Sequence, residues 1–223
     1  MNAKIYICHY PPLTERKKYL DDVIPKLGIP FDFYSNFNRE NIKNYDNKFS
    51  SSQDILKHKG WSGSSLIMSS SIKATTLEHA KIYEEIIKNN YDYSIILEDD
   101  AILIDDFKEQ LIKMVNNLPE DWDVVYFSSG CGGRPILRDR NGTNLVKMQE
   151  RTSWTANGYL INNQTAKKFI NFIYPIALPI DFELSFIQKH LQMNVYWAVN
   201  PLVYEGSNPA AGSRYRYGSS QIR

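Results

Sequence analysis

Apolar and polar positions along this chain follow two periods, which predict strands and helices in turn. Short runs rich in β-branched and aromatic residues predict strands at residues 4–9, 31–34, 93–97, 123–128, 159–161 and 194–199. Longer stretches with apolar residues three or four positions apart predict helices at residues 14–26, 71–89, 106–117, 163–174 and 181–191. Strands that alternate with helices favour an α/β fold with a single, mostly parallel central sheet flanked by helices.

Helix starts refine this prediction. Thr14 is expected to cap the first helix, and Asp106 with Glu109 resembles a capping box. The helix at 71–89 is expected to bury one face, which carries Ile72, Thr76, His79, Tyr83 and Ile86. A lone histidine on such a face is more often a hydrogen-bonded core residue than a ligand, so His79 alone does not mark a site.

A chain of 223 residues suits one domain, which we expect to span residues 1–223. Residues 36–71 are polar, which predicts a mobile loop or a small insertion with Trp61 as an exposed aromatic lip. Residues 206–223 are expected to form a flexible tail. The tail carries three arginines that either clamp a diphosphate or belong to a frayed terminus, and both interpretations stay open: Arg214, Arg216 and Arg223.

Charge and composition exclude several classes of protein. Lys and Arg number 26 against 25 Asp and Glu, so no net field recruits nucleic acid. The start of the chain has no apolar signal segment, and no run approaches the roughly 20 apolar residues of a membrane span. Two cysteines, Cys8 and Cys131, favour reduced thiols. We therefore expect a cytoplasmic protein without a transmembrane segment, and attachment to a membrane face stays open.

The strongest chemical signal is an apolar strand that runs directly into Glu98, Asp99 and Asp100. Like charges repel and are costly to desolvate, so this turn needs a compensating group. In extended backbone Glu98 and Asp100 lie on one side and Asp99 on the other. Two carboxylates on one side can share Mg²⁺ or Mn²⁺ with substrate phosphates. The alternative is a solvated acidic turn.

A second acidic pair, Asp181 and Glu183, could supply a general base that takes a proton from an attacking hydroxyl group. The alternative is structural, because Asp181 stands where a helix N-cap belongs and Glu183 would complement the first turn. On the pattern alone, capping is the better interpretation. The chain has no Cys/His zinc spacing, no glycine-rich phosphate loop of known spacing and no G-x-S-x-G elbow.

Several of these pieces, in this order, resemble glycosyltransferase family 25, which includes bacterial lipooligosaccharide galactosyltransferases and procollagen galactosyltransferase domains. The motifs that carry the resemblance are Glu15-Arg16, Leu77-Glu78-His79, Ile96 to Asp100, Asp121-Trp122-Asp123, Thr155 to Leu160 and Pro179-Ile180-Asp181. The chain departs from the family pattern where Glu78 replaces a serine and Ala74-Thr75 replaces a Gly-Cys pair.

The resemblance implies a GT-A, Rossmann-like nucleotide-sugar transferase fold. It also implies a metal-dependent, inverting transfer of a hexose, galactose or glucose, from a UDP-sugar to a hydroxyl acceptor. The acceptor would be a glycan, a lipid-linked glycan or a glycoprotein, with lipopolysaccharide biosynthesis as one setting. The implied cofactor is Mn²⁺, with Mg²⁺ as the alternative.

The acidic turn and the resemblance together predict a role for each candidate residue. Glu98 and Asp100 bind the metal. Asp181, ahead of Glu183, is the catalytic base. The donor-binding residues are Arg16, His79, Glu98, Asp99 and Asp100.

Two other classes of protein could also carry an acidic strand end of this kind. The first is a non-catalytic module that binds a nucleotide or sugar on a degenerate transferase fold, and incubation with a panel of UDP-sugars separates it from an enzyme. The second is a phosphoacceptor signalling domain, which would place its acidic pair after the first strand. Here the acidic turn comes far too late in the chain for that class.

Overall fold

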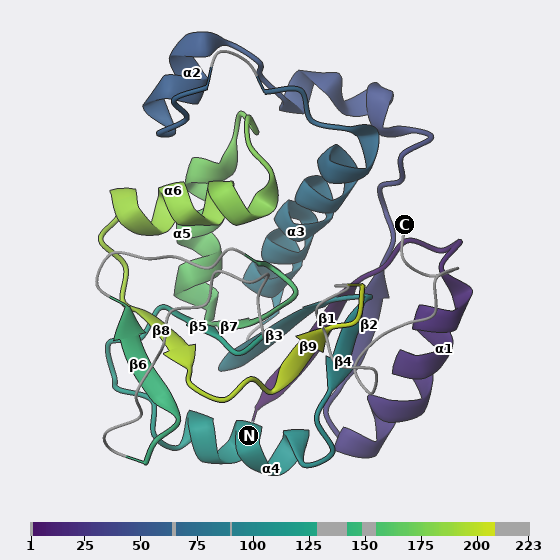
Figure 1. Cartoon of the computed structure of the whole chain (residues 1–223), viewed down its shortest axis with the longest axis vertical. Helices are drawn as coiled ribbons and strands as arrows, with labels where there is room; N and C mark the ends of the chain where they lie inside the picture. The colour runs from purple at the N-terminus through teal and green to yellow at the C-terminus, as the bar shows by residue number, and fades with distance from the viewer. Residues whose placement is uncertain (1, 64–65, 90, 129–141, 149–154, 208–223) are drawn as a thin grey trace.

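The computed structural model describes residues 2–63, 66–89, 91–128, 142–148 and 155–207. These residues form a central seven-stranded sheet between two layers of helices (Figure 1). In spatial order its strands are β2 (Phe31–Tyr34), β1 (Ala3–Cys8), β3 (Tyr93–Glu98), β7 (Gly158–Ile161), β5 (Val124–Tyr126), β8 (Val195–Ala198) and β6 (Leu145–Met148). A separate antiparallel pair joins β4 (Ala101–Leu103) to β9 (Val203–Glu205).

The central sheet is mixed but mostly parallel. β1 pairs in parallel with β2 and β3, and β5 pairs in parallel with β8. β7 runs antiparallel between β3 and β5, and β6 lies antiparallel on β8. The predicted α/β class with a mostly parallel sheet is confirmed. The reversed strand in its middle and the separate β4–β9 pair were not predicted.

Alternation along the strands divides the apolar residues between two cores. On β1, Tyr6 and Cys8 face one core, whereas Ile5 and Ile7 face the other. The first core is covered by α3 (Ser70–Lys88), α5 (Asn163–Ile173) and α6 (Ile180–His190). The second is covered by α1 (Thr14–Val23) and α4 (Phe107–Val115).

The predicted buried face of α3 is correct except at its start. His79 has no exposed surface, whereas Ile72 is 39% exposed. Ile72 belongs to the first turn, where α3 projects beyond the sheet (Figure 1). His79 therefore lies in the part of the helix that packs against the strands.

Three predicted caps differ from the structure. Thr14 is the first residue of α1 and Leu13 precedes it as N-cap. Asp106 is the N-cap of α4, but its carboxylate accepts a hydrogen bond from the Gln110 side chain and caps no backbone N–H. Asp181 is inside α6, whose N-cap is Pro179. A proline is tolerated here because the first backbone N–H groups of a helix have no partner within it.

Residues 36–71 contain local structure that the polar composition concealed. They include a 3₁₀ segment, η2 (Ile42–Lys48), and a short helix, α2 (Gln53–His58). Leu56 of α2 is buried with Ala177 and Leu178, and Trp61 packs against this cluster. The Trp61 and Phe182 rings meet edge to face with centroids 5.9 Å apart. The prediction of an exposed aromatic lip is therefore wrong, because Trp61 fastens the insertion to the segment before α6.

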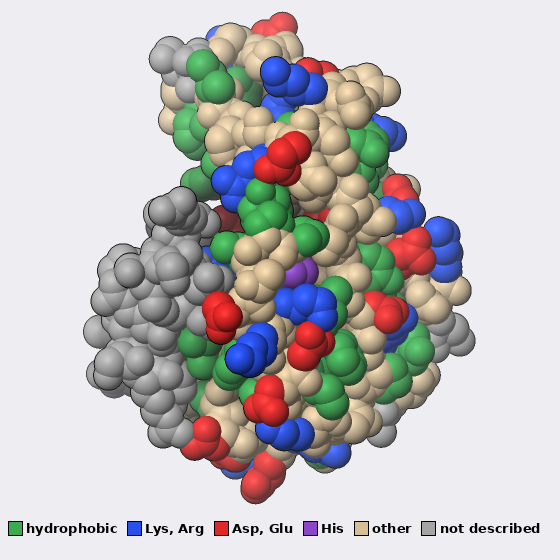
Figure 2. Space-filling model, turned by 90° about the vertical axis from the view of Figure 1, so that its right-hand side faces the viewer, with side chains coloured by type: hydrophobic (Ala, Val, Ile, Leu, Met, Phe, Trp, Pro, Cys, Tyr) green, Lys and Arg blue, Asp and Glu red, His purple; other side chains and the backbone are tan. Residues whose placement is uncertain are grey.

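The surface over α1 and β2 mixes charges of both signs (Figure 2). Lys17 pairs with Asp21 and Lys26 with Asp22, each one helical turn apart. Among the described residues, this face therefore carries no extensive basic patch of the kind that binds a phosphate backbone. None of the helices in the described ranges combines the length and apolarity that a bilayer crossing requires.

Candidate functional site

The acidic turn lies in a pocket where two parallel strands end. Cys8 at the end of β1 is in register with Glu98 at the end of β3. Open α/β sheets bind ligands outside the carboxyl ends of such strands. The pocket has a volume of about 440 Å³, which suits a small organic ligand. Its walls come from the end of β1, the start of α1, the segment after β2, the first half of α3, the acidic turn and the end of β9.

Asp99 faces α1 and is fully engaged there. Its Oδ1 accepts a hydrogen bond from Arg16 Nη1 at 2.7 Å. Its Oδ2 lies 3.0 Å from His9 Nδ1 and accepts from the Tyr10 backbone N–H at 2.9 Å. Burial acts to raise the pKa of Asp99, but the His9 and Tyr10 hydrogen bonds and the Arg16 charge outweigh it, so the pKa is lowered. Asp99 therefore stays ionised and fastens α1 to the end of β3.

Glu98 points the other way, toward α3. Its Oε1 lies 3.2 Å from His79 Nε2. His79 Nδ1 lies 2.8 Å from the Tyr159 hydroxyl, which is 2.6 Å from the Tyr83 hydroxyl. Burial lowers the pKa of His79 to about 4, so the ring is neutral at pH 7. With Glu98 ionised, Nε2–H donates to the carboxylate, Nδ1 accepts from Tyr159, and Tyr159 accepts from Tyr83.

Asp100 is held by residues from two distant parts of the chain. Asn157 Nδ2 donates to Asp100 Oδ1, and the Ser207 hydroxyl donates to Oδ2. The Gly206 backbone N–H donates to the Asp100 carbonyl at 2.8 Å. Residues 206 and 207, the start of the predicted flexible tail, therefore fold back on the acidic turn. Later residues of that tail lie outside the described part of the chain.

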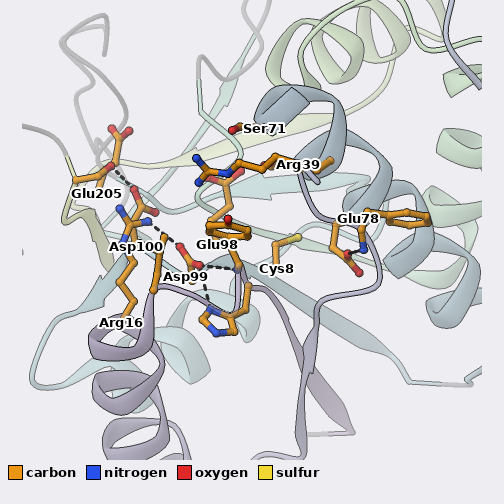
Figure 3. Close-up of a pocket in the computed structure, with 16 residues that line it drawn as sticks. Cys8, Arg16, Arg39, Ser71, Glu78, Glu98, Asp99, Asp100 and Glu205 are labelled. Carbon is orange, nitrogen blue, oxygen red and sulfur yellow. Dashed lines mark hydrogen bonds and ion pairs between the residues drawn. The ribbon is translucent and has the colours of Figure 1, made fainter. Parts of the chain in front are cut away.

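The environments of Glu98 and Asp100 raise their pKa values, in contrast to that of Asp99. Burial, followed by the charges of Asp99 and Glu205, raises the pKa of Glu98 to about 7. Burial, followed by the charge of Glu98, raises the pKa of Asp100 to about 7. Asp99 faces Arg16 (Figure 3), whereas Glu98 bonds His79 and Asp100 bonds Asn157, so the three carboxylates of the turn have separate partners.

The donor atoms around Asp100 suit a hard divalent cation. Carboxylate oxygens of Glu98 and Asp100 are ligands that Mg²⁺ and Mn²⁺ accept. Asn157 adds a side-chain carbonyl, Oδ1, that is buried and has no hydrogen-bond partner among the described residues. In the same ranges, no three His, Cys, Asp or Glu residues converge as a complete metal site. A cation here would take its other ligands from water or a substrate, as Mg²⁺ commonly does.

Asp181 lies near the acidic turn but does not line the pocket. Burial, followed by the charge of Glu98, raises its pKa to about 7, and a hydrogen bond from the Ala156 backbone N–H opposes that rise. Asp181 lies in the first turn of α6, where the helix dipole favours a negative charge, but it does not cap the helix. A carboxyl group with a pKa near 7 can exchange protons at physiological pH.

Glu183 has a structural environment. It has no exposed surface, and its Oε2 accepts from Lys59 Nζ at 2.6 Å. Its Oε1 accepts from the backbone N–H groups of Ala177 and Leu178 at 2.7 and 2.9 Å. Lys59 also donates to the carbonyl oxygens of Ile173 and Pro175. Glu183 therefore anchors the insertion to α6 and does not reach the pocket, which argues against the predicted catalytic role.

The structure adds residues that sequence reasoning missed. Glu205 and Arg39 line the pocket, and Asn157 holds Asp100. Glu78, where the sequence departs from the family pattern, accepts hydrogen bonds from the Asn36 side chain and the Phe37 backbone, which shapes one wall. Glu205 and Arg39 lie in no such motif, whereas Glu78 and Asn157 lie in two motifs that carry the family resemblance but had no expected role of their own. The three arginines of the predicted tail lie outside the described residues.

Comparison with protein families gives a match over residues 2–184 to the model described as glycosyltransferase family 25 (LPS biosynthesis protein). Procollagen galactosyltransferase 2 of Homo sapiens is 27% identical over 116 residues, which are 47% of this chain and 17% of that protein. Procollagen galactosyltransferase 1-B of Xenopus laevis is 30% identical over 115 residues, 47% of this chain and 18% of that protein. The matched part is therefore under a fifth of each relative.

A solved structure gives an independent comparison of the fold. A glycosyltransferase involved in glycosylation of the major capsid of PBCV-1 superposes with a TM-score of 0.53. The superposition covers 96% of this chain and 95% of that one, at 8% sequence identity. At such low identity the likeness concerns the fold alone, and it agrees with the predicted GT-A architecture.

Proposed function

The chain belongs to glycosyltransferase family 25, and we propose that it transfers a hexose from a UDP-sugar to a hydroxyl group, with inversion at the anomeric carbon. The observation that carries this proposal is the pocket at the ends of β1 and β3, with Glu98 and Asp100 in its wall. The family prediction is confirmed. The matched relatives are galactosyltransferases by name, which favours galactose over glucose as the transferred sugar.

Glu98 and Asp100 would hold Mn²⁺ or Mg²⁺ beside the donor diphosphate. When bound, the cation neutralises charge that builds on the departing nucleotide. The chain's own part is to fix the two carboxylates. His79 orients Glu98, while Asn157 and Ser207 orient Asp100. Hydrogen bonds of this kind to ligating carboxylates set both geometry and affinity in metal sites.

Asp181 is the proposed general base. As the acceptor oxygen forms a bond to the anomeric carbon, the bond from that carbon to the diphosphate oxygen breaks and UDP departs. The acceptor proton passes to the Asp181 carboxylate, and from there to solvent. Inversion requires the acceptor and the leaving group on opposite faces of the sugar. A base outside the donor pocket, yet close enough to Glu98 for their charges to interact, suits that requirement.

The acceptor is proposed by class: a glycan, a lipid-linked glycan or a glycoprotein. The family description points to lipopolysaccharide, and the relatives' names point to procollagen. Both kinds of acceptor offer a hydroxyl group, so the chemistry at Asp181 is the same for each.

A panel of UDP-sugars with manganese tests the proposal, with UDP release as the measurement. Even without an acceptor, slow hydrolysis of one donor is expected, because water can replace the acceptor hydroxyl. Asp100→Ala and Asp181→Asn should each lower turnover by about 10²- to 10³-fold. Asp22→Asn, an exposed carboxylate on α1, is the matched control and should change nothing.

The outcomes separate the two functions considered. UDP binding without turnover of any donor, even with acceptors added, would indicate a non-catalytic binding module. Unchanged turnover in Asp100→Ala would contradict the role of the acidic turn. Unchanged turnover in Asp181→Asn, with Asp100→Ala inactive, would remove only the base assignment.

A further inference from the structure

The pocket is unexpectedly acidic for a site that accepts a diphosphate. Among the described residues it is lined by five carboxylates, and these are Glu78, Glu98, Asp99, Asp100 and Glu205. A divalent cation offsets part of this charge, but the phosphates still need hydrogen-bond donors. Two guanidinium groups also line the pocket, on Arg16 and Arg39.

Arg16 has a structural role in the protein. Its side chain is only 7% exposed, and Nη1 donates to Asp99 Oδ1 at 2.7 Å. Removing it from Asp99 to serve a ligand would leave a buried carboxylate unpaired, which is costly. Arg16 therefore contributes charge to the pocket, but its hydrogen bond to Asp99 serves the protein itself.

Arg39 has the opposite character. It belongs to the segment after β2, and its side chain is 41% exposed. Its nearest carboxylate contact, to Glu40, is 4.0 Å long, and the same Glu40 oxygen already accepts from the Tyr10 hydroxyl at 2.7 Å. Figure 3 shows its side chain reaching across the pocket toward the acidic turn, from the side opposite Arg16. It can therefore turn its donors to a ligand at little cost.

Tyr10 holds Arg39 in this position. The guanidinium carbon lies 4.3 Å from the centroid of the Tyr10 ring, a cation–π contact. The Tyr10 backbone N–H donates to Asp99 and its hydroxyl donates to Glu40, so both ends of this residue are restrained beside the acidic turn. Because the stack is pre-organised, less side-chain freedom is lost when a ligand binds.

We propose that Arg39 binds the diphosphate of the donor directly, from the side of the pocket opposite Arg16. Two N–H groups of its planar guanidinium would donate to two phosphate oxygens. The inference rests on the proposed use of a nucleoside diphosphate sugar. It adds to the donor site a residue that lies outside every motif of the chain, and it gives the two arginines different roles. Arg16 holds the site together, and Arg39 binds what enters it.

Calorimetric titrations with UDP and with uridine, both in the presence of manganese, test this inference. Arg39→Ala should weaken UDP binding by about 10- to 100-fold, the usual range for a charged hydrogen bond to phosphate. Uridine has no phosphate, so its affinity should change by less than about twofold. Arg39→Lys keeps the charge without the fork and should fall between the two. Lys43→Ala removes an exposed cation of the same segment that does not line the pocket, and it should match the wild type.

The outcomes separate the role of Arg39 from the proposed function. Equal UDP affinity in the wild type and Arg39→Ala would overturn the inference and leave the proposed function intact. Equal losses for UDP and uridine would also overturn it, because a general distortion of the pocket would then be responsible. A wild-type protein that binds no nucleoside diphosphate, in a panel of UDP, GDP and ADP, would overturn both statements. Because Arg39 is partly exposed, its variants are expected to keep the wild-type melting curve.

Discussion

Asp181 and Glu183 lie two residues apart on one helix and meet opposite environments. Two residues turn a helix by about 200°, so their side chains leave α6 on opposite sides. Glu183 enters a closed junction with Lys59 and two backbone N–H groups. Asp181 instead shares a region with Glu98, where burial and like charge raise its pKa to about 7. A buried carboxylate is therefore not by itself evidence of a catalytic role. A buried carboxylate without a compensating cation is the better candidate.

The acidic turn repeats this contrast between adjacent residues. Asp99 is paired with Arg16 and its pKa is lowered, while Asp100 beside it has a pKa raised to about 7. Both carboxylates are nearly inaccessible to solvent. What separates them is whether the fold itself supplies a positive partner. Asp99 has its positive partner within the protein, and for Asp100 we propose the bound cation as that partner.

The largest effect should come from breaking the compensated pair on α6. Glu183→Gln leaves the Lys59 ammonium, whose side chain is 4% exposed, without its counter-charge. We expect the free energy of unfolding to fall by about 3–5 kcal/mol, measured by urea denaturation. Asp181→Asn should cost less than about 1 kcal/mol, because no described cation pairs with Asp181. Equal losses in the free energy of unfolding for the two variants would contradict the proposed difference between the two environments.

A double variant sharpens the same point. Lys59→Met with Glu183→Leu removes both charges and keeps apolar volume in the junction. It should recover much of the stability that Glu183→Gln loses, as buried ion pairs replaced by apolar residues often do. A double variant as unstable as Glu183→Gln would indicate that the hydrogen bonds to Ala177 and Leu178 dominate instead.

A second, smaller effect should appear in the pH dependence of stability. Asp100 has a pKa near 3.8 when unfolded and about 7 when folded. Between these values the folded state binds more protons, so the free energy of unfolding falls as pH rises from about 4 to 7. In EDTA, the urea midpoint should be lower at pH 8 than at pH 5.

The variant Asp100→Asn isolates this contribution. It should reduce the loss of stability between pH 5 and pH 8 by about 2 kcal/mol, allowing for the coupling with Glu98. Manganese should restore stability at pH 8 in the wild type and much less in the variant. The Asp99 contribution has the opposite sign, since its pKa is lowered, and is lost only in more acidic solution. An identical pH profile in Asp100→Asn would contradict the assignment.

The smallest effect concerns the hydroxyl groups behind Glu98. Tyr159→Phe removes the hydroxyl that bonds both His79 and Tyr83. We expect a loss of about 1 kcal/mol in stability. Because His79 then loses the partner that fixes its tautomer, manganese affinity should fall by about tenfold. Urea denaturation and a manganese titration measure the two effects separately.

A matched control exists in the same core. Tyr126→Phe removes a buried hydroxyl that bonds Gln188 and has no contact with His79. It should cost similar stability and leave manganese affinity unchanged. If both variants changed the affinity alike, the loss would come from general loosening of the core rather than from the contact with Glu98.

Local pattern predicted much of this fold. The expected strand at 31–34 coincides with β2, and the expected helix at 71–89 differs from α3 by one residue at each end. Both elements have apolar residues at regular spacing, and that spacing is a property of nearby residues only. The acidic turn was found in the same way, because three carboxylates after a buried strand conflict with the local environment.

What the sequence could not supply depends on distant parts of the chain. The spacing of Asp181 and Glu183 predicts different faces, but not which face meets Lys59. Lys59 lies in a polar segment without periodicity, so its burial had no local signal. Arg39 and Asn157 are single polar residues in irregular segments, and only tertiary structure brings them to the pocket and to Asp100.

The reversed strand β7 has a consequence for the order of folding. Asn157 immediately precedes it, and the partners of Asp100 stand 57 and 107 residues away in sequence. Contacts this distant close late, after local helices and the early β1–β2 pairing. During synthesis, Glu98 and Asp100 therefore stay hydrated until the last third of the chain arrives. Their mutual repulsion increases when β7 docks between β3 and β5, and the two cores that close in the same step oppose it.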